Sequence, residues 1–305
     1  MSNACKLVRF DCGQRLAGSD SAADPLIIAA LIVCVASRRE FPAAWIFMWS
    51  LAILIYALCK LATWQSSPSH APWWKHAGYL LFWPGSMRTG SFRRNSPLTR
   101  ASRAGIMLAT ARMLSGIALF WLVPRLIPEA PGLIHAWCGM AGTVLILHFG
   151  LFDLLLQFWM SMDAGVRPLM DHPLRATSVA EFWGRRWNTA FRDLANQFLF
   201  RRLSRTLAPT FALAAVFLFS GVVHDLVISI PAEGGYGLPT LYFAIQSLAM
   251  LAERSRPGRR LGLMSGWKGW LFTAAVLLIP VPLLLHEAFR NNVVLPMMSD
   301  LGALR

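Results

Sequence analysis

The chain has 305 residues, of which 56% are hydrophobic and only 14% are charged, whereas soluble domains usually carry about a quarter charged residues. This deficit and the long apolar runs exclude an ordinary soluble domain and predict an integral membrane protein made of packed helices. The net charge of +14 is mostly arginine, and it gathers between the apolar runs, which argues against a nucleic-acid partner and favours anionic lipid headgroups or a phosphate-bearing cosubstrate.

The first 24 residues are predicted to be a polar N-terminal tail, because they hold basic residues but no apolar core before Pro25. We expect residues 25–305 to form one membrane-embedded domain. The five cysteines are scattered and contain no CxxC pair, so they suggest neither a disulfide framework nor a zinc site. We predict no metal site and no resident cofactor.

Apolar runs predict an all-α polytopic membrane bundle with about seven to nine membrane segments. The runs lie at 25–36, 41–64, 104–124, 133–160, 207–230, 238–252 and 268–286. A span needs about 20 apolar residues, so 25–36 and 238–252 are expected to be tilted, buried among other helices or extended by polar flanks. The short segment GYLLFWPG, which ends beside Pro84, is predicted to be a re-entrant or interfacial piece.

Arginine-rich loops set the expected orientation in the membrane. The loops 86–103, 161–206 and 254–260 are strongly basic, whereas PRLIPEAPG and PAEGGYG are nearly free of positive charge. The positive-inside rule places the three basic loops in the cytoplasm, in a bacterial inner membrane or in the endoplasmic reticulum of a eukaryote. One discordant segment is SRRE at 37–40, which this scheme places outside. Either its flanking runs form a hairpin that does not fully cross, or the short loop is tolerated.

The segment EFWGRRWN (181–188) mixes two tryptophans with two arginines. On a helical wheel of 179–203, Trp183 and Trp187 share a face within about 40°, and the arginines lie away from it. The pattern predicts an amphipathic helix at the membrane interface, capped by Thr177 or Ser178. Asn188 falls on the border between the two faces. It either caps or bonds a neighbour, or it contacts a ligand.

The run from Thr210 to Ile230 holds one adjacent ionisable pair, His224 and Asp225. A central Asp costs about 2.5–3.5 kcal/mol in a membrane span, so such residues normally face a cavity, a partner or a reaction. Ser220 and Gly221 leave the face of His224 narrow enough for another helix or a substrate to approach. The alternative is a histidine that pairs two helices. Asp225 points about 100° away on the wheel, toward an arginine or another helix.

Three further polar residues interrupt the run 133–160. They are His148, Asp153 and Gln157. Asp153 and Gln157 are four residues apart and share a helix face. These residues either bond neighbouring helices or line a substrate tunnel.

FWGRRWN (182–188) followed by SGVVHD (220–225) resembles the membrane-bound O-acyltransferases, specifically their wax synthase-like branch. FWPGSM (82–87) is similar to the WPGM element of that branch, with Ser86 interrupting it. The resemblance implies that Asn188 and His224 form the catalytic pair. It also implies that acyl-CoA is the cosubstrate and that an apolar tunnel holds the acyl chain and the alcohol.

The function implied is transfer of a fatty acyl group from acyl-CoA to a lipophilic alcohol, within membrane lipids. His224 would be the base, and Asn188 would orient the hydroxyl or the thioester carbonyl. The expected substrate-binding residues are Trp183, Arg185, Arg186, Trp187, Arg192, Ser220, Gly221 and Asp225, with the arginines meeting the phosphates of coenzyme A. Two alternatives stay open: another acceptor (a glyceride, a sterol or a secondary metabolite), or a non-catalytic transporter or lipid-binding protein. The oligomeric state is left open as well.

Overall fold

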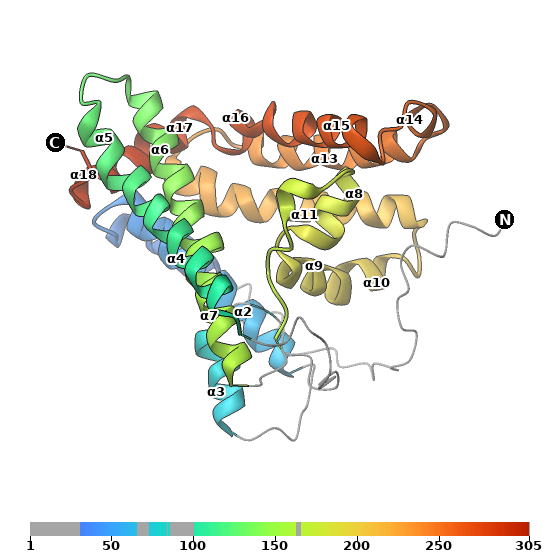
Figure 1. Cartoon of the computed structure of the whole chain (residues 1–305), viewed down its shortest axis with the longest axis horizontal. Helices are drawn as coiled ribbons and strands as arrows, with labels where there is room; N and C mark the ends of the chain where they lie inside the picture. The colour runs from blue at the N-terminus through green and yellow to red at the C-terminus, as the bar shows by residue number, and fades with distance from the viewer. Residues whose placement is uncertain (1–30, 66–72, 84, 86–100, 163–165, 305) are drawn as a thin grey trace.

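The computed structural model describes residues 31–65, 73–83, 85, 101–162 and 166–304. Within these ranges the chain forms helices and turns and no β-strand. Five helical segments are long and apolar enough to cross a membrane (Figure 1): Ala44–Gln65, Arg103–Leu126, Gly132–Ser161, Pro209–Ala232 and Gly266–Leu284. Only 11–28% of the most apolar stretch of each is buried, so most of its apolar side chains face outward, as lipid contact requires. The all-α membrane fold is confirmed.

Several of these spans contain a π-helical segment, whose wider turns often mark functional sites. The spans are α2 (Ala44–Gln65), α4 (Arg103–Ile117) with η3 (Ala118–Leu122) and α5 (Val123–Leu126), α6 (Gly132–Val144) with η4 (Leu145–Leu151) and α7 (Phe152–Ser161), α11 (Pro209–His224) with η8 (Asp225–Ser229) and α12 (Ile230–Ala232), and α15 (Gly266–Leu278) with α16 (Val281–Leu284). The segments η3, η4 and η8 are π-helical.

The remaining helices are shorter than the spans. They are η1 (Ser37–Glu40), α3 (Trp73–Phe82), η5 (Pro173–Arg175), α8 (Val179–Glu181), η6 (Phe182–Arg186), α9 (Thr189–Ala195), η7 (Asn196–Phe200), α10 (Arg201–Leu203), α13 (Leu238–Arg254), α14 (Arg256–Arg260), α17 (Glu287–Phe289), η9 (Arg290–Val294) and α18 (Leu295–Asp300). The predicted tail 1–24 lies outside the described residues. So does the first half of the run 25–36, of which residues 31–36 are helical. The count of seven to nine membrane segments is therefore not confirmed.

The helix α13 is the buried centre of the C-terminal half. It packs along α11 and beside α15 (Figure 1), and Phe243, Gln246 and Glu253 on it are nearly or fully buried. The run 238–252 is therefore one of the short runs that are buried among other helices, as one of the expected alternatives had it.

The two ends of α13 hold two other segments in place. Near its N-terminus, α11 approaches so closely that a Cβ on Gly221 would lie 2.6 Å from the Cα of Thr240. Near its C-terminus, the Glu253 carboxylate accepts hydrogen bonds from the backbone N–H groups of Val179 (2.7 Å) and Ala180 (2.9 Å). These are free N–H groups in the first turn of α8, where a carboxylate is favourable.

The discordant segment SRRE lies beside the PAEGGYG loop. Arg38 in η1 donates to the Glu233 carboxylate and forms an ion pair with it. Both segments therefore lie on one side of the molecule, as the predicted topology requires. Which side faces the cytoplasm stays a prediction.

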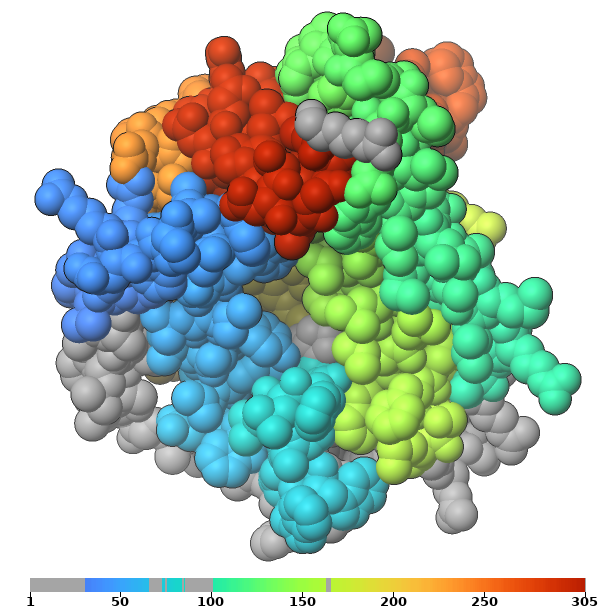
Figure 2. Space-filling view, turned by 90° about the vertical axis from the view of Figure 1, so that its left-hand side faces the viewer, coloured from blue at the N-terminus to red at the C-terminus, as the bar shows by residue number. Residues whose placement is uncertain are grey.

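Residues 78–82 of the predicted short piece form the end of α3, which packs beside α2 and contacts α7 through Gly78 and Trp159. Trp83 is buried, and the Gly85 carbonyl accepts a 2.6 Å hydrogen bond from the Lys60 ammonium. Figure 2 shows a recess on this face, between α2 and the helix formed by α6 and α7. Ser86 and Met87 of the FWPGSM element lie outside the described residues.

Candidate active site

The segment FWGRRWN does not lie within one helix. α8 runs into the π-helical η6, which ends when the Trp187 N–H bonds the Phe182 carbonyl at 2.9 Å. Asn188 then adopts a left-handed conformation with φ 41°, which Asn tolerates better than most residues. A new helix, α9, begins after it. The continuous amphipathic helix predicted for 179–203 is therefore wrong, since the apolar periodicity carries on across a break.

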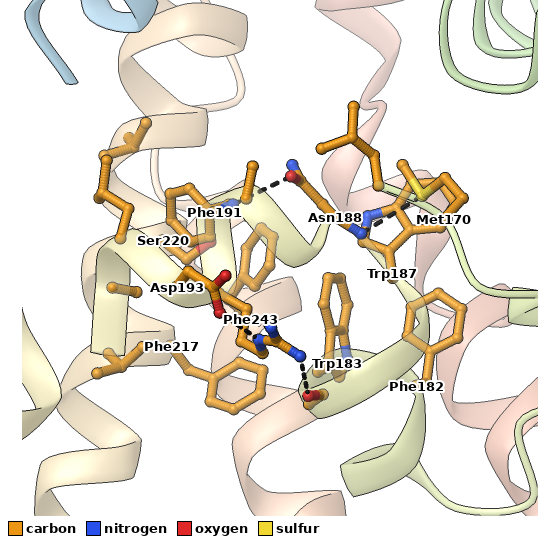
Figure 3. A pocket seen from close by; sticks show the side chains of 18 of the residues that line it. Met170, Phe182, Trp183, Trp187, Asn188, Phe191, Asp193, Phe217, Ser220 and Phe243 are labelled. Atoms are coloured by element: carbon orange, nitrogen blue, oxygen red, sulfur yellow. Dashed lines mark hydrogen bonds and ion pairs between the residues drawn. The ribbon is translucent and has the colours of Figure 1, made fainter. Parts of the chain in front are cut away.

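The side chain of Asn188 has one end fixed and one end open. Its Oδ1 accepts the backbone N–H of Phe191 at 3.1 Å and caps α9 (Figure 3). The capping alternative is confirmed, and it determines the amide's orientation because an N–H can donate only to the oxygen. The Nδ2 group makes no hydrogen bond to any described residue, and Asn188 lines a cavity. The open end is therefore a hydrogen-bond donor.

Arg186 and Glu181 close the turn of the motif. The Glu181 carboxylate accepts from Arg186 Nε (2.9 Å) and from the backbone N–H of Thr177 (2.8 Å), and Ser178 caps α8. Arg186 also donates to the Asp171 carbonyl at 3.0 Å. Burial alone would raise the pKa of Glu181, but the bonds from Thr177 and Arg186 lower it below its usual value. Arg186 is only 16% exposed, and it does not line the cavity.

The other two arginines differ from each other. Arg192 donates to the carboxylate of the neighbouring Asp193 at 2.9 Å and to the Gly184 carbonyl at 3.0 Å, so it also braces the turn. Arg185 is 72% exposed and lies 3.9 Å from the Asp171 carboxylate, at the limit of an ion pair. Both line the cavity. Of the three arginines expected to meet phosphates, Arg185 is the most available.

His224 ends α11 and precedes the π-helical η8. Its Nδ1 lies 2.6 Å from the Ser220 carbonyl oxygen. A carbonyl only accepts hydrogen bonds, so Nδ1 carries the proton and the neutral ring presents an unprotonated Nε2. That atom makes no hydrogen bond to a described residue. The ring packs on Phe243, with centroids 4.5 Å apart, and His224 and Ser220 line the cavity.

Asp225 has no share in the cavity. Its carboxylate accepts from Ser229 Oγ (2.9 Å), from the N–H groups of Gly237 (2.8 Å) and Thr240 (3.1 Å), and from the Thr240 hydroxyl. It therefore pairs with another helix, α13, as one of the expected alternatives had it, and not with an arginine. Gly221 also faces α13. Neither residue lines the cavity, in contrast to the substrate-binding roles expected for them.

The cavity joins the two motifs. Its volume is about 3420 Å³, several times that of a typical small-molecule pocket. Trp183, Trp187 and Asn188 line it from one motif, and Ser220 lines it from the other (Figure 3). His224 of the second motif lines it as well. Buried Gln246 supports the wall, since it accepts from Trp183 Nε1 (3.3 Å) and donates to the Val276 carbonyl (2.9 Å). A cavity of this size can hold two long chains.

Polar residues of other spans divide between bracing and lining. Asp153 pairs with Arg112 at 2.9 Å and Gln157 accepts the Ser102 N–H at 3.0 Å, which confirms helix-to-helix bonding for both. His148 lines the cavity, as does Lys60, a buried lysine whose ammonium lies 3.6 Å from the centre of the Tyr79 ring. Sequence reasoning missed Lys60, although a lone lysine in an apolar run was a usable signal.

Metal ligands do not gather in the described part of the chain, where no group of three or more His, Cys, Asp or Glu residues could hold an ion. The cavity instead offers a base at His224, a donor at Asn188 and an exposed cation at Arg185.

Comparison with known proteins gives a family and a set of relatives. Residues 166–245 match the membrane bound O-acyl transferase family, which confirms the resemblance inferred from the two motifs. Three curated relatives are from Arabidopsis thaliana. "Probable long-chain-alcohol O-fatty-acyltransferase 7" is 28% identical over 155 residues (45% of this chain and 45% of the relative). "Probable long-chain-alcohol O-fatty-acyltransferase 6" is 28% identical over 124 residues (38% and 36%), and "Probable long-chain-alcohol O-fatty-acyltransferase 3" is 27% identical over 104 residues (31% and 30%). The matches span less than half the length of these relatives.

Proposed function

We propose that this integral membrane chain, whose residues 166–245 match the membrane bound O-acyl transferase family, transfers a fatty acyl group from acyl-CoA to a lipophilic alcohol. The observation that carries the proposal is His224. One of its ring nitrogens is held by the Ser220 carbonyl, and the other is left as a free base on the wall of a cavity wide enough for two chains. Asn188 supplies an amide donor to the same cavity.

These groups suit acyl transfer to a hydroxyl. The alcohol O–H gives its proton to Nε2 of His224 as the oxygen adds to the thioester carbon, forming the new C–O bond. Asn188 Nδ2 donates toward the carbonyl oxygen while negative charge develops there. The C–S bond then breaks, and the thiolate of coenzyme A takes the proton from His224. The ester and free coenzyme A are the products, and the base returns to its starting state.

Recognition of coenzyme A is assigned to the exposed arginine. Arg185 would meet the phosphates, while Arg186 and Arg192 hold the turn that carries Asn188. Acyl-CoA is a cosubstrate in this proposal, and no resident cofactor takes part. We place the protein in the bacterial inner membrane or the endoplasmic reticulum, with the arginine-rich loops in the cytoplasm.

The test is expression in a host that lacks neutral lipid synthesis, with a long-chain alcohol supplied and total lipids profiled by mass spectrometry. The expected result is a new ester that needs the wild-type chain and disappears with His224→Ala at equal protein level. Parallel feeding with a glyceride and a sterol distinguishes the acceptors. If no ester of any acceptor forms while the protein is folded in the membrane, the proposal is wrong and a transport or lipid-binding role takes its place.

A further inference from the structure

His148 is a second histidine on the cavity wall. It lies in the π-helical η4, in the middle of a membrane-spanning helix. Its ring stacks on Trp187 of the FWGRRWN segment, with centroids 5.8 Å apart and an angle of 15°, and Trp187 stacks in turn on Phe182 (5.5 Å, 14°). Stacking on Trp187, the residue before Asn188, fixes the plane of the His148 ring. The position of the ring is therefore tied to the motif.

Neither ring nitrogen of His148 has a hydrogen-bond partner among the described residues. Nδ1 is enclosed by protein, whereas Nε2 is not, and His148 lines the cavity. An enclosed N–H without an acceptor is rarer than an unused lone pair, so the proton belongs on Nε2, the nitrogen left open to the cavity. By contrast, His135 on the same long helix bonds the Ile127 carbonyl through Nε2 at 3.0 Å. An unpaired imidazole in a membrane span needs a partner, and the described residues do not supply one.

His148 and His224 thus present opposite hydrogen-bonding groups. His224 offers an acceptor, because its Nδ1 holds the proton, and His148 offers a donor. Asn188 Nδ2 is a second donor, on the residue next to Trp187. A thioester carbonyl oxygen accepts hydrogen bonds and cannot donate one, so it matches these two donors.

We propose that His148 donates a hydrogen bond from Nε2 to the carbonyl oxygen of the acyl group bound in the cavity, together with Asn188. This inference rests on the acyl-CoA activity proposed above. It makes His148 a third residue that touches the reacting group, since that oxygen gains negative charge when the alcohol adds.

The test compares two unreactive coenzyme A thioethers of equal chain length, measured by titration calorimetry on purified protein. A 2-oxoalkyl thioether keeps a carbonyl, and an S-alkyl thioether has none. We expect the wild type to bind the carbonyl analogue about fivefold tighter, equivalent to about 1 kcal/mol. His148→Phe keeps the stack on Trp187 and should remove about half of that preference, because Asn188 still donates to the carbonyl, whereas His148→Gln keeps a donor and should restore part of it. His135→Phe is the matched control and should leave the preference unchanged.

The outcomes separate the two proposals. If the wild type binds neither analogue, the acyl-CoA function fails. If it binds both but His148→Phe keeps the full preference, the function stands and the role of His148 is wrong. A variant that weakens only alcohol binding would also overturn the assignment to the carbonyl, because the ring would then bind the acceptor's hydroxyl.

Discussion

His224 and Asp225 are neighbours in the chain, yet they occupy opposite surroundings. The polar groups around Asp225 form a closed cluster, in which they hydrogen-bond one another. The Asp225 carboxylate accepts four hydrogen bonds from Ser229, Gly237 and Thr240. His286 extends this cluster, with Nε2 3.2 Å from Ser229 Oγ and Nδ1 accepting the Phe289 N–H. Among the described residues, His224 makes one hydrogen bond, to the Ser220 carbonyl, and its second ring nitrogen has no partner.

The comparison separates two uses of costly polar groups in an apolar span. A closed cluster fastens helices together, so its loss should be seen in the stability of the fold. An open group is held in one orientation with an unused atom, so its loss should be seen in turnover. Each prediction below tests this division.

The largest expected effect is at His224. His224→Ala should lower ester formation about 10²–10⁴-fold, the usual contribution of a general base, equivalent to about 3–5 kcal/mol of barrier. Membrane insertion and the apparent melting temperature in detergent should change little. The measurements are turnover per folded molecule and a thermal melt. A well-folded His224→Ala protein with near wild-type turnover would remove the mechanism proposed here.

Asn188 should affect both turnover and stability, because its Nδ2 faces the cavity and its Oδ1 caps α9. Asn188→Asp keeps the oxygen that caps α9 but loses the Nδ2 donor, so turnover should fall about 10²-fold while stability is kept. Asn188→Ala should lose the cap as well, at a cost of about 1 kcal/mol. The double variant with His224→Ala should lose less than the two separate losses combined, since both act on one transition state. Full turnover in Asn188→Asp would show that the amide serves only as a cap.

The closed cluster predicts a different result. Asp225→Ala removes the acceptor of the part-buried Thr240 donors and of the Gly237 N–H, and should lower the free energy of unfolding by about 2 kcal/mol. Asp225→Asn should be milder, because its amide oxygen can still accept. Turnover per folded molecule should stay within a few-fold of wild type in both. A large loss of turnover without a loss of stability would contradict the division.

The two adjacent arginines offer a smaller and more specific test. Arg185→Gln should raise the KM for acyl-CoA about threefold to tenfold and leave the KM for alcohol unchanged. Arg186→Gln should mainly lower thermal stability, because it breaks the contacts with Glu181 and the Asp171 carbonyl. Steady-state kinetics with each substrate varied, together with a melt, separates the two. Equal KM effects for both variants would argue against a special role for Arg185.

The smallest effect concerns acid. The pKa of Glu181 is lowered in the folded state, so its contribution to stability is present above its unfolded pKa and is lost as pH falls through the folded pKa. We expect the stability that Glu181 contributes to disappear as pH falls below the ordinary titration range of a glutamate carboxyl. Melts of wild type and Glu181→Gln across pH 3–7 should converge at the acidic end. Parallel curves across that range would assign the acid sensitivity to other groups.

The sequence predicts the spans well, since a run of about 20 apolar residues has few other stable uses. It does not predict the break at Asn188, because Trp183, Trp187 and Phe191 keep a helical period across it. Only the fold shows that η6 widens the turn and that Asn188 caps a new helix.

The partners of the charged residues were also beyond sequence reasoning. The availability of Arg185 depends on how Glu181 and Asp193 pair with the neighbouring arginines, Arg186 and Arg192. The direction of Asp225 on the helical wheel left an arginine or another helix as its partner, and Thr240 could not be named from the sequence. His148 was recognised as a polar residue with two uses, and its choice of the cavity required the stack on Trp187.

The buried helix α13 contacts the segments that carry the two motifs, one near each of its ends. The Asp225 carboxylate accepts the Thr240 N–H in the first turn of α13, so the segment that ends in His224 is anchored there. The Glu253 carboxylate in the last turn of α13 accepts the Val179 N–H at the start of α8, so the segment that leads to Asn188 is anchored at the other end. The 17 residues of α13, at about 1.5 Å each, set the distance between these two anchoring contacts. One inserted residue between Thr240 and Glu253 would shift the far anchor by about 1.5 Å and turn it by about 100°, so it would misplace α8 relative to α11.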